Sequence, residues 1–182
     1  MIRLNPFDIF AIQNIIALYC LALDTKDFAR LHHVFTPDVE TIYPFGGKRQ
    51  GVQSNNNLPK YHSHSNLNTG FLGNDDGWRN VDIDRGKRLA PVSSQHALTT
   101  QHILLSPDGQ SATATTYFTG IHFGKGKWEG KEVTAWGKYT DTLTFLGEAE
   151  SELPGASGRW RISRREVTFM GRLGEEGVMD GE

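Results

Sequence analysis

Apolar residues recur at helical spacing near the start of the chain. They occupy Ile9, Ile12, Ile16, Tyr19 and Leu23. Steps of three and four residues place these side chains on one face of an α-helix. Asn5 and Pro6 come just before this stripe, and both residue types favour the cap and first turn of a helix. The pattern therefore predicts a helix over residues 7–23 with one buried face.

Two shorter elements and a long irregular stretch follow this helix. Residues 27–34 predict a short second helix, with Pro37 beyond its end. Residues 39–43 have the β-branched and aromatic character of a strand. Residues 46–92 are rich in Gly, Asn and Asp and are interpreted as a loop-like insertion. A lid over a pocket and a structureless insertion are equally open readings of this stretch.

Beyond residue 93 the helical period gives way to alternation of apolar and polar residues. The alternating segments are 96–105, 111–123, 132–145 and 160–171. In the last segment Trp160 and Val167 belong to opposite parities of an apolar face, which predicts a β-bulge near Arg164 and Arg165. Helices followed by a run of antiparallel strands indicate an α+β fold. A strongly curved antiparallel sheet wrapped around helix 7–23 would leave a cavity suited to a small molecule.

Length and composition fit one domain spanning residues 1–182. The chain has 37% hydrophobic and 22% charged residues, which is ordinary for a soluble globular protein. A net charge of −2 gives no electrostatic reason to expect nucleic acid or a membrane as partner. The single cysteine, Cys20, falls in the first helix and is expected in the core. The apolar run 9–23 is shorter than a membrane span, and a cytoplasmic protein is predicted.

The first candidates for chemistry are an aspartate and a histidine. Asp24 follows the apolar stripe of the first helix, so its carboxylate is expected at the rim of the core. His96 opens the first long strand. If the fold brings the two together, the carboxylate orients the imidazole for general-base chemistry. A satisfied structural histidine is the alternative reading of His96.

A second candidate is Asp141, which interrupts an apolar strand face. Its neighbours of the same parity include Val133, Tyr139 and Leu143. A buried carboxylate is costly unless it is paired or protonated, so it marks either a site or a structural ion pair with an arginine. As a site residue it would face the cavity and donate a proton. Metal binding is not expected, because the histidines, including His62 and His64, lack the spacing of a zinc site.

Several segments in order resemble the SnoaL-like branch of the nuclear transport factor 2-like superfamily. They are Tyr19–Phe28, Val34–Val39, Ser94-Gln95-His96 and Gly158–Ile162. The resemblance covers most of residues 7–45 and 93–171. It implies a cone-shaped curved antiparallel sheet around a long N-terminal helix. Scytalone dehydratase is the closest catalytic parallel within this superfamily.

The resemblance also implies roles for individual residues. Asp24 and His96 match the acid–base pair of that family, and Tyr43 matches a tyrosine that polarises the substrate carbonyl. Three positions depart from the pattern: Leu23 replaces a second tyrosine, Thr116 falls near the second histidine, and Asp141 falls near an asparagine. The substrate is therefore expected to differ. The residues expected to bind it are Tyr19, Leu23, Thr116, Phe118, His122 and Tyr139.

The Asp24 and His96 pattern and the resemblance together imply a lyase or isomerase that needs no cofactor. Its substrate would be a cyclic small molecule with a carbonyl, of polyketide or terpenoid character, and secondary metabolism is the expected setting. His96 would transfer the proton, Asp24 would hold its tautomer, Tyr43 would bind the carbonyl and Asp141 would act on a leaving hydroxyl. The alternative is a non-enzymatic binding or oligomerising module, like the small subunit of ring-hydroxylating dioxygenases. A homodimer or homotrimer is expected in either case.

Overall fold

The first helix carries the core of the molecule. A computed structural model of the chain describes residues 5–43, 47–50, 89–147 and 153–180. Helix α1 spans Phe7–Thr25, and the Asn5 side chain accepts a hydrogen bond of 3.0 Å from the Phe7 backbone N–H. It has the length and hydropathy of a membrane-crossing helix, but half of it is buried inside the protein. It is therefore the predicted core helix, two residues longer than expected at its end.

The elements after α1 differ in detail from the prediction. The short helix is a 3₁₀ helix, η1 (Phe28–His33), and strand β1 (Phe35–Tyr43) begins four residues before the predicted start. Pro37 thus lies inside β1, where the pairing of β1 with its neighbour is irregular. Proline has no backbone N–H to donate to a neighbouring strand, and it is tolerated here because the pairing is interrupted at this point. Most of the predicted insertion, residues 51–88, lies outside the described residues.

A six-stranded sheet forms the second layer. The remaining strands are β2 (Gly47–Gln50), β3 (Ser93–Leu105), β4 (Ser111–Phe123), β5 (Glu132–Phe145) and β6 (Trp160–Gly174), and two more short 3₁₀ helices are η2 (Gly126–Trp128) and η3 (Glu176–Asp180). The strand order is β2-β1-β6-β5-β4-β3. All neighbours are antiparallel except β1 and β6, which are parallel. The wholly antiparallel sheet that the sequence predicted is therefore corrected at one pair, because β1 enters from α1 and η1 and not through a hairpin.

The predicted bulge in the last strand is present. Thr142 lies opposite Arg164 and Leu143 lies opposite Ile162, which leaves Ser163 without a partner in the register. One extra residue shifts the parity of the strand. Arg165 therefore turns inward and is completely buried.

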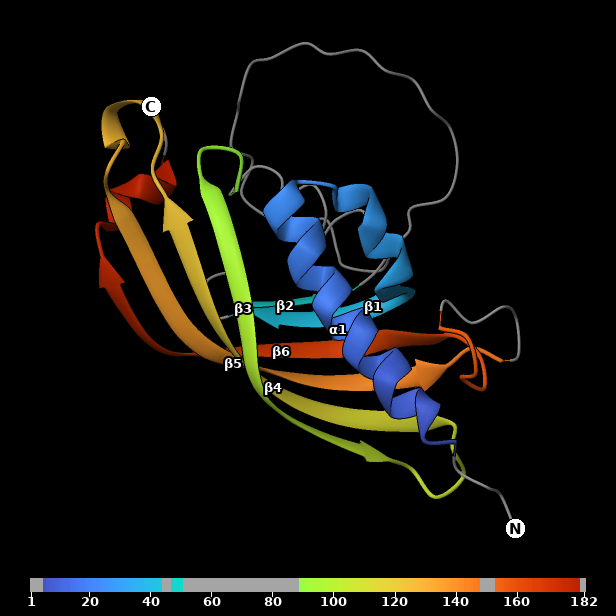
Figure 1. The fold of residues 1–182 in the computed structure, drawn as a ribbon. Helices are drawn as coiled ribbons and strands as arrows, with labels where there is room; N and C mark the ends of the chain where they lie inside the picture. The colour runs from blue at the N-terminus through green and yellow to red at the C-terminus, as the bar shows by residue number, and fades with distance from the viewer. Residues whose placement is uncertain (1–4, 44–46, 51–88, 148–152, 181–182) are drawn as a thin grey trace.

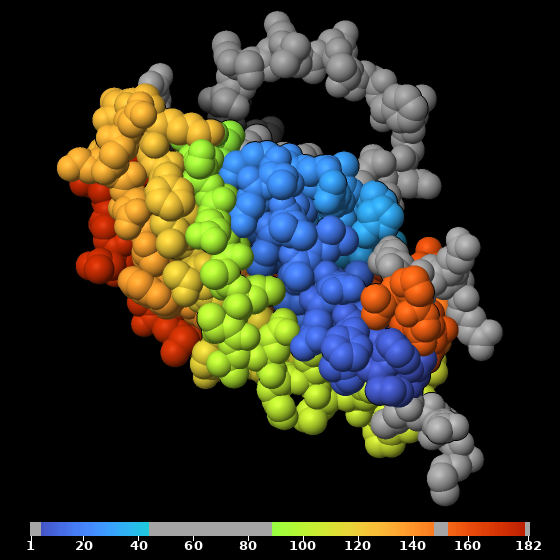
Figure 2. All heavy atoms as spheres, viewed as in Figure 1, coloured from blue at the N-terminus to red at the C-terminus, as the bar shows by residue number. Residues whose placement is uncertain are grey.

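The sheet curves around α1, as Figure 1 shows. In the space-filling view of Figure 2 the blue α1 packs along the green β3. Their side chains form one core that also includes β1 and β6 residues such as Phe35, Trp160 and Ile162. Cys20 is 4% exposed, which confirms it as a buried core residue, and this burial raises the pKa of its thiol to about 12. The end of α1 and the start of β3 consequently lie side by side.

Candidate active site

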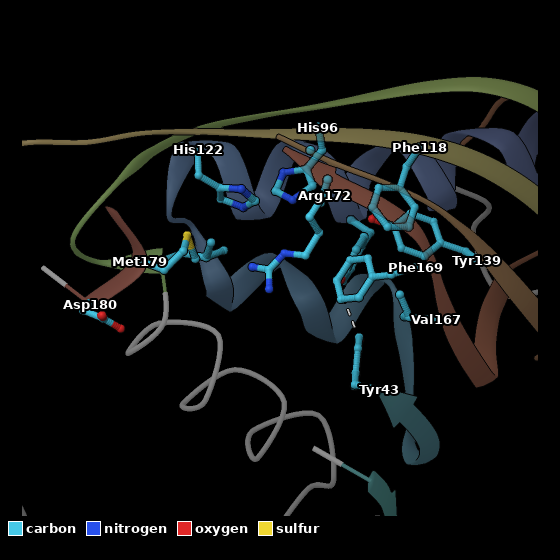
Figure 3. A pocket seen from close by; sticks show the side chains of 14 residues that line it. Tyr43, His96, Phe118, His122, Tyr139, Val167, Phe169, Arg172, Met179 and Asp180 are labelled. Atoms are coloured by element: carbon cyan, nitrogen blue, oxygen red, sulfur yellow. Dashed lines mark hydrogen bonds between the residues drawn. The ribbon is translucent and has the colours of Figure 1, made fainter. Parts of the chain in front are cut away.

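A pocket of about 330 Å³ opens at the concave face of the sheet. It is lined by Tyr19, Tyr43, Leu89, His96, Phe118, Gly120, His122, Ala135, Tyr139, Val167, Phe169, Arg172, Met179 and Asp180. Figure 3 draws these side chains as sticks, and the labelled ones come from β1, β3, β4, β5, β6 and η3. The lining combines aromatic and aliphatic side chains with a few polar groups, which is typical of small-molecule sites.

Asp24 and His96 meet at the edge of this pocket. The Nδ1–H of His96 donates to Oδ1 of Asp24 over 2.7 Å, and the backbone N–H of His96 donates to Oδ2 over 2.8 Å. The Asp24 carboxylate is thus held by both its oxygens. The predicted contact is confirmed, and the His96 side chain is only 7% exposed.

The hydrogen bonds fix the roles of the two ring nitrogens. Because Nδ1 carries the proton toward Asp24, Nε2 holds the lone pair of the neutral ring. Gly120 lies opposite His96 in the sheet, and a Cβ at that position would lie 3.4 Å from Nε2. The missing side chain of Gly120 therefore leaves room for a reacting atom next to the basic nitrogen.

Two further residues secure Asp24. The Ser94 hydroxyl donates to Oδ1 of Asp24 over 3.1 Å, and Nζ of Lys26 donates to that hydroxyl over 2.8 Å. Burial alone would raise the pKa of Asp24, but the hydrogen bonds from His96 and Ser94 outweigh it and hold the pKa below its usual value. Asp24 therefore stays ionised and can stabilise a positive charge on His96.

A second histidine lies beside His96. The rings of His96 and His122 meet edge to face with centroids 5.5 Å apart. Burial lowers the pKa of His122 to about 4, and His96, Lys26 and Arg172 add to this, although a backbone hydrogen bond to Val133 opposes it. His122 is therefore a neutral polar group of the pocket at neutral pH.

The low pKa of His122 predicts a loss of stability in acid. Between pH 6.5 and 4 the His122 side chain is protonated in the unfolded chain but not in the native protein. The free energy of unfolding therefore falls as the pH falls. The expected loss is about 2–3 kcal/mol. Urea unfolding at several pH values should show it for the wild type and not for His122→Phe. His102→Gln, a change at an exposed histidine, should keep the wild-type slope. An equal acid loss in His122→Phe would contradict this account.

Aromatic residues form the opposite wall of the pocket. Phe118 and Tyr139 stack with centroids 4.4 Å apart, and the hydroxyls of Tyr19 and Tyr43 lie within 3.4 Å of each other. All four residues line the pocket, as the sequence predicted. Flat apolar walls with phenol groups on one side suit a ring that carries an oxygen.

Comparison with known families agrees with this architecture. The model of the SnoaL-like domain matches residues 8–166, which is most of the chain. The chain belongs to the SnoaL-like family. It therefore lies in the nuclear transport factor 2-like superfamily, as the resemblance implied. No curated protein matches the chain.

Solved structures share this SnoaL-like fold at low sequence identity. The Kfla4162 protein of Kribbella flavida is 13% identical with a TM-score of 0.65, and the alignment covers 91% of this chain and 93% of that one. A protein assigned as a scytalone dehydratase, from Novosphingobium aromaticivorans, is 16% identical with a TM-score of 0.62 and coverages of 93% and 88%. The hexachlorocyclohexane dehydrochlorinase LinA-type3 of Novosphingobium barchaimii is 12% identical with a TM-score of 0.62 and coverages of 93% and 91%. Lyase-type relatives thus share the fold of this SnoaL-like protein.

The predicted place of Asp141 in the pocket is wrong. Both its oxygens accept hydrogen bonds of 2.7 Å from Arg165, and the two side chains are fully buried. The Arg165 guanidinium in turn lies 4.1 Å from the ring centre of Tyr19 and 4.3 Å from that of Tyr139. Asp141 is absent from the pocket lining, and its carboxylate neutralises a buried cation. The structural ion pair, which was the alternative reading, describes it.

Two predicted binding residues also lie outside the pocket lining. Leu23 is 1% exposed and belongs to the hydrophobic core under α1. Thr116 is completely buried, and its hydroxyl accepts a hydrogen bond of 3.4 Å from Gln101. Counting along the chain placed Thr116 near a second histidine, but His122 occupies the position beside His96.

Several pocket residues were missed from the sequence. Phe169 continues the parity of Val167 after the bulge, so this signal was available. Arg172 lies near the C-terminal end of β6, beyond the hydrophobic core, where strand parity alone does not indicate a cavity. Met179 and Asp180 come from η3, which had no strong sequence signal. Among the described residues, no group of three His, Cys, Asp or Glu side chains could hold a metal ion, and the absence of a cofactor stays a prediction.

Proposed function

We propose that this SnoaL-like protein is a cofactor-independent lyase or isomerase that moves a proton on a small cyclic molecule bearing a carbonyl. His96 is the base, Asp24 holds its tautomer, and Tyr43 hydrogen-bonds the carbonyl oxygen. The observation that carries the proposal is the Asp24–His96 pair, bonded through Nδ1 over 2.7 Å at the edge of a pocket. An oriented neutral imidazole inside an apolar pocket is the arrangement that general-base catalysis needs.

The first step breaks a carbon–hydrogen bond next to the carbonyl. The proton goes to Nε2 of His96, the electron pair forms a carbon–carbon double bond, and the carbonyl π pair moves onto oxygen. The resulting imidazolium is stabilised by the ionised Asp24. Returning the proton to another carbon gives an isomer. If the proton goes instead to a hydroxyl on the neighbouring carbon, the enolate re-forms the carbonyl, its carbon–carbon electron pair forms the new double bond to that carbon, and the carbon–oxygen bond breaks to release water. His96 then serves both as base and as acid, and Asp141 is not required.

The size and lining of the pocket support a small, ring-shaped substrate. Its volume of about 330 Å³ is at the lower end of the range for ligand pockets. The stacked pair of Phe118 and Tyr139 offers a flat wall, and the Tyr19 and Tyr43 hydroxyls supply polar groups at one side. Lyases among the structural neighbours, such as hexachlorocyclohexane dehydrochlorinase LinA-type3, are consistent with elimination chemistry on this fold.

A non-enzymatic binding or oligomerising module is the competing proposal. A cavity packed shut by side chains, or a His96 side chain exposed to solvent, would favour this module. The pocket here is open, and the His96 side chain is only 7% exposed. These observations support the enzyme over the module. The homo-oligomer, cytoplasmic location and lack of nucleic-acid or membrane partners remain proposals.

Deuterium uptake tests the proposal without knowledge of the natural substrate. A panel of cyclic ketones and β-hydroxy ketones is incubated with the protein in heavy water, and the carbon next to the carbonyl is followed by NMR. The proposal expects catalysed uptake, or elimination, with at least one compound. Binding of panel members in the pocket without any catalysed exchange would favour the binding module.

A further inference from the structure

The pocket contains a cation that the proton-transfer scheme does not use. Arg172, on β6, is part of the lining, and its guanidinium lies 5.8 Å from the ring centre of Phe169. Figure 3 shows this guanidinium directed into the space between the two histidines and Phe169. The positive charge of Arg172 also contributes to the lowered pKa of His122, which agrees with this placement. A charged group therefore reaches the same space as the basic nitrogen of His96.

The surrounding groups leave this charge available to a ligand. His122 is neutral, because burial lowers its pKa to about 4. The exposed Glu176 lies 3.5 Å from Nη1 of Arg172, and the two side chains are 68% and 42% exposed. Such a water-exposed pair is weak and gives way to a better-placed anion. Asp180, the acidic residue of the described lining, belongs to η3 and lies apart from the guanidinium in Figure 3.

We propose that Arg172 binds an anionic oxygen on the substrate, so that the substrate class is a planar cyclic compound whose carbonyl oxygen becomes an enolate. The inference rests on the proposed function, because His96 creates that negative charge when it removes the proton. The N–H groups of Arg172 donate to this oxygen as its charge develops, in addition to the hydrogen bond from Tyr43. A guanidinium suits this task because it stays protonated and offers several donors in one plane. Arg172 is in this way a catalytic residue, and Phe169 packs beside its guanidinium.

The test uses two near-isosteric ring compounds that differ in charge. 4-Nitrophenolate is a stable, flat mimic of an enolate, and 4-nitroaniline is its neutral counterpart. Their dissociation constants are measured by calorimetry, at a pH where the phenol is ionised, for the wild type, Arg172→Gln and Arg172→Lys. Arg164→Gln is the matched control, because Arg164 lies on the same strand, pairs with Glu40 and Glu166, and is absent from the lining.

The wild type and Arg164→Gln should bind the phenolate at least about tenfold more tightly than the aniline, and Arg172→Gln should lose about 10–100-fold in phenolate affinity only. Arg172→Lys should retain part of the preference. His96→Asn should keep it, which excludes proton uptake by His96 as its source. Circular dichroism confirms that each variant is folded.

No preference for the anion in the wild type, including no binding of it, would overturn the inference. So would an unchanged preference in folded Arg172→Gln. Neither result touches the role of His96, since deuterium uptake measures that separately.

Discussion

Replacing Asp141 by asparagine should destabilise the protein by about 3–5 kcal/mol. The substitution leaves the fully buried Arg165 without a negative partner. Burial opposes the charge on Arg165, but Asp141 outweighs it and keeps the pKa of this arginine above its usual value. A guanidinium keeps its proton even without an anionic partner, so Arg165 stays charged after the substitution. The uncompensated buried charge must then be accommodated. Chemical unfolding and thermal unfolding both measure the effect, with a melting temperature lowered by about 6–20 °C.

Two further variants control for this result. Glu40→Gln removes a partly exposed pair with Arg164 and should cost only about 0–1 kcal/mol. The double variant Asp141→Asn, Arg165→Met removes the cation as well and should recover part of the lost stability. Asp141→Asn with wild-type stability would show that this ion pair does not hold the centre of the sheet together.

Replacing Asp24 by asparagine should slow the catalysed reaction by about 10²–10⁴-fold without unfolding the protein. The two carboxylate oxygens of Asp24 accept from the Nδ1–H and from the backbone N–H of His96. An amide has one oxygen and one NH₂ group, so it can accept only one of these bonds. If the NH₂ faces Nδ1, the proton moves to Nε2 and the ring loses its basic atom in the pocket. If the NH₂ faces the backbone N–H, two donors meet and the pair is disrupted.

The rate of deuterium uptake in heavy water measures this effect. Asp27→Asn is the matched control, since Asp27 is a nearby exposed carboxylate that pairs with Arg30 outside the pocket. It should leave the rate unchanged. An Asp24→Asn variant with the wild-type rate would mean that the tautomer of His96 is not set by Asp24.

The fold and the contact between Asp24 and His96 follow from local signals in the sequence. The stripe of α1 ends directly before Asp24, and the alternation of β3 includes His96 near its start. Because α1 packs along β3, these two ends meet, and their contact was predicted correctly. The long strands were located well for the same reason: alternation reports burial on one face of a sheet.

The parallel pairing of β1 with β6 and the contents of the pocket were harder to predict. A strand pattern shows which face is buried but does not identify the neighbouring strand or its direction. The strand alternation correctly predicts that Asp141 is buried. It does not show whether a buried carboxylate faces a cavity or pairs with an arginine. The partner, Arg165, turns inward only because of the bulge at Ser163. The sequence predicts the bulge, but the alternation around it does not show which face the Arg165 side chain takes.

The pocket residue Arg172 illustrates the remaining limit of sequence patterns. It lies beyond a second irregularity, where Trp136 is opposite Gly171 and Gly137 is opposite Phe169. Met170 is the extra residue there, and it changes the parity of the strand once more. The side chain then reaches the pocket from the outer part of β6, next to residues of η3. Two successive shifts of register are required to place it, and neither leaves a clear hydrophobic pattern around an arginine.

The most direct test of proton transfer by His96 compares the wild type with His96→Asn in heavy water. NMR follows deuterium at the carbon next to the carbonyl of a panel compound that the wild type processes. The asparagine keeps a polar side chain of similar size but has no basic nitrogen. The account predicts catalysed uptake by the wild type and a rate about 10²–10⁴-fold lower for folded His96→Asn. Equal rates for the two proteins would contradict it.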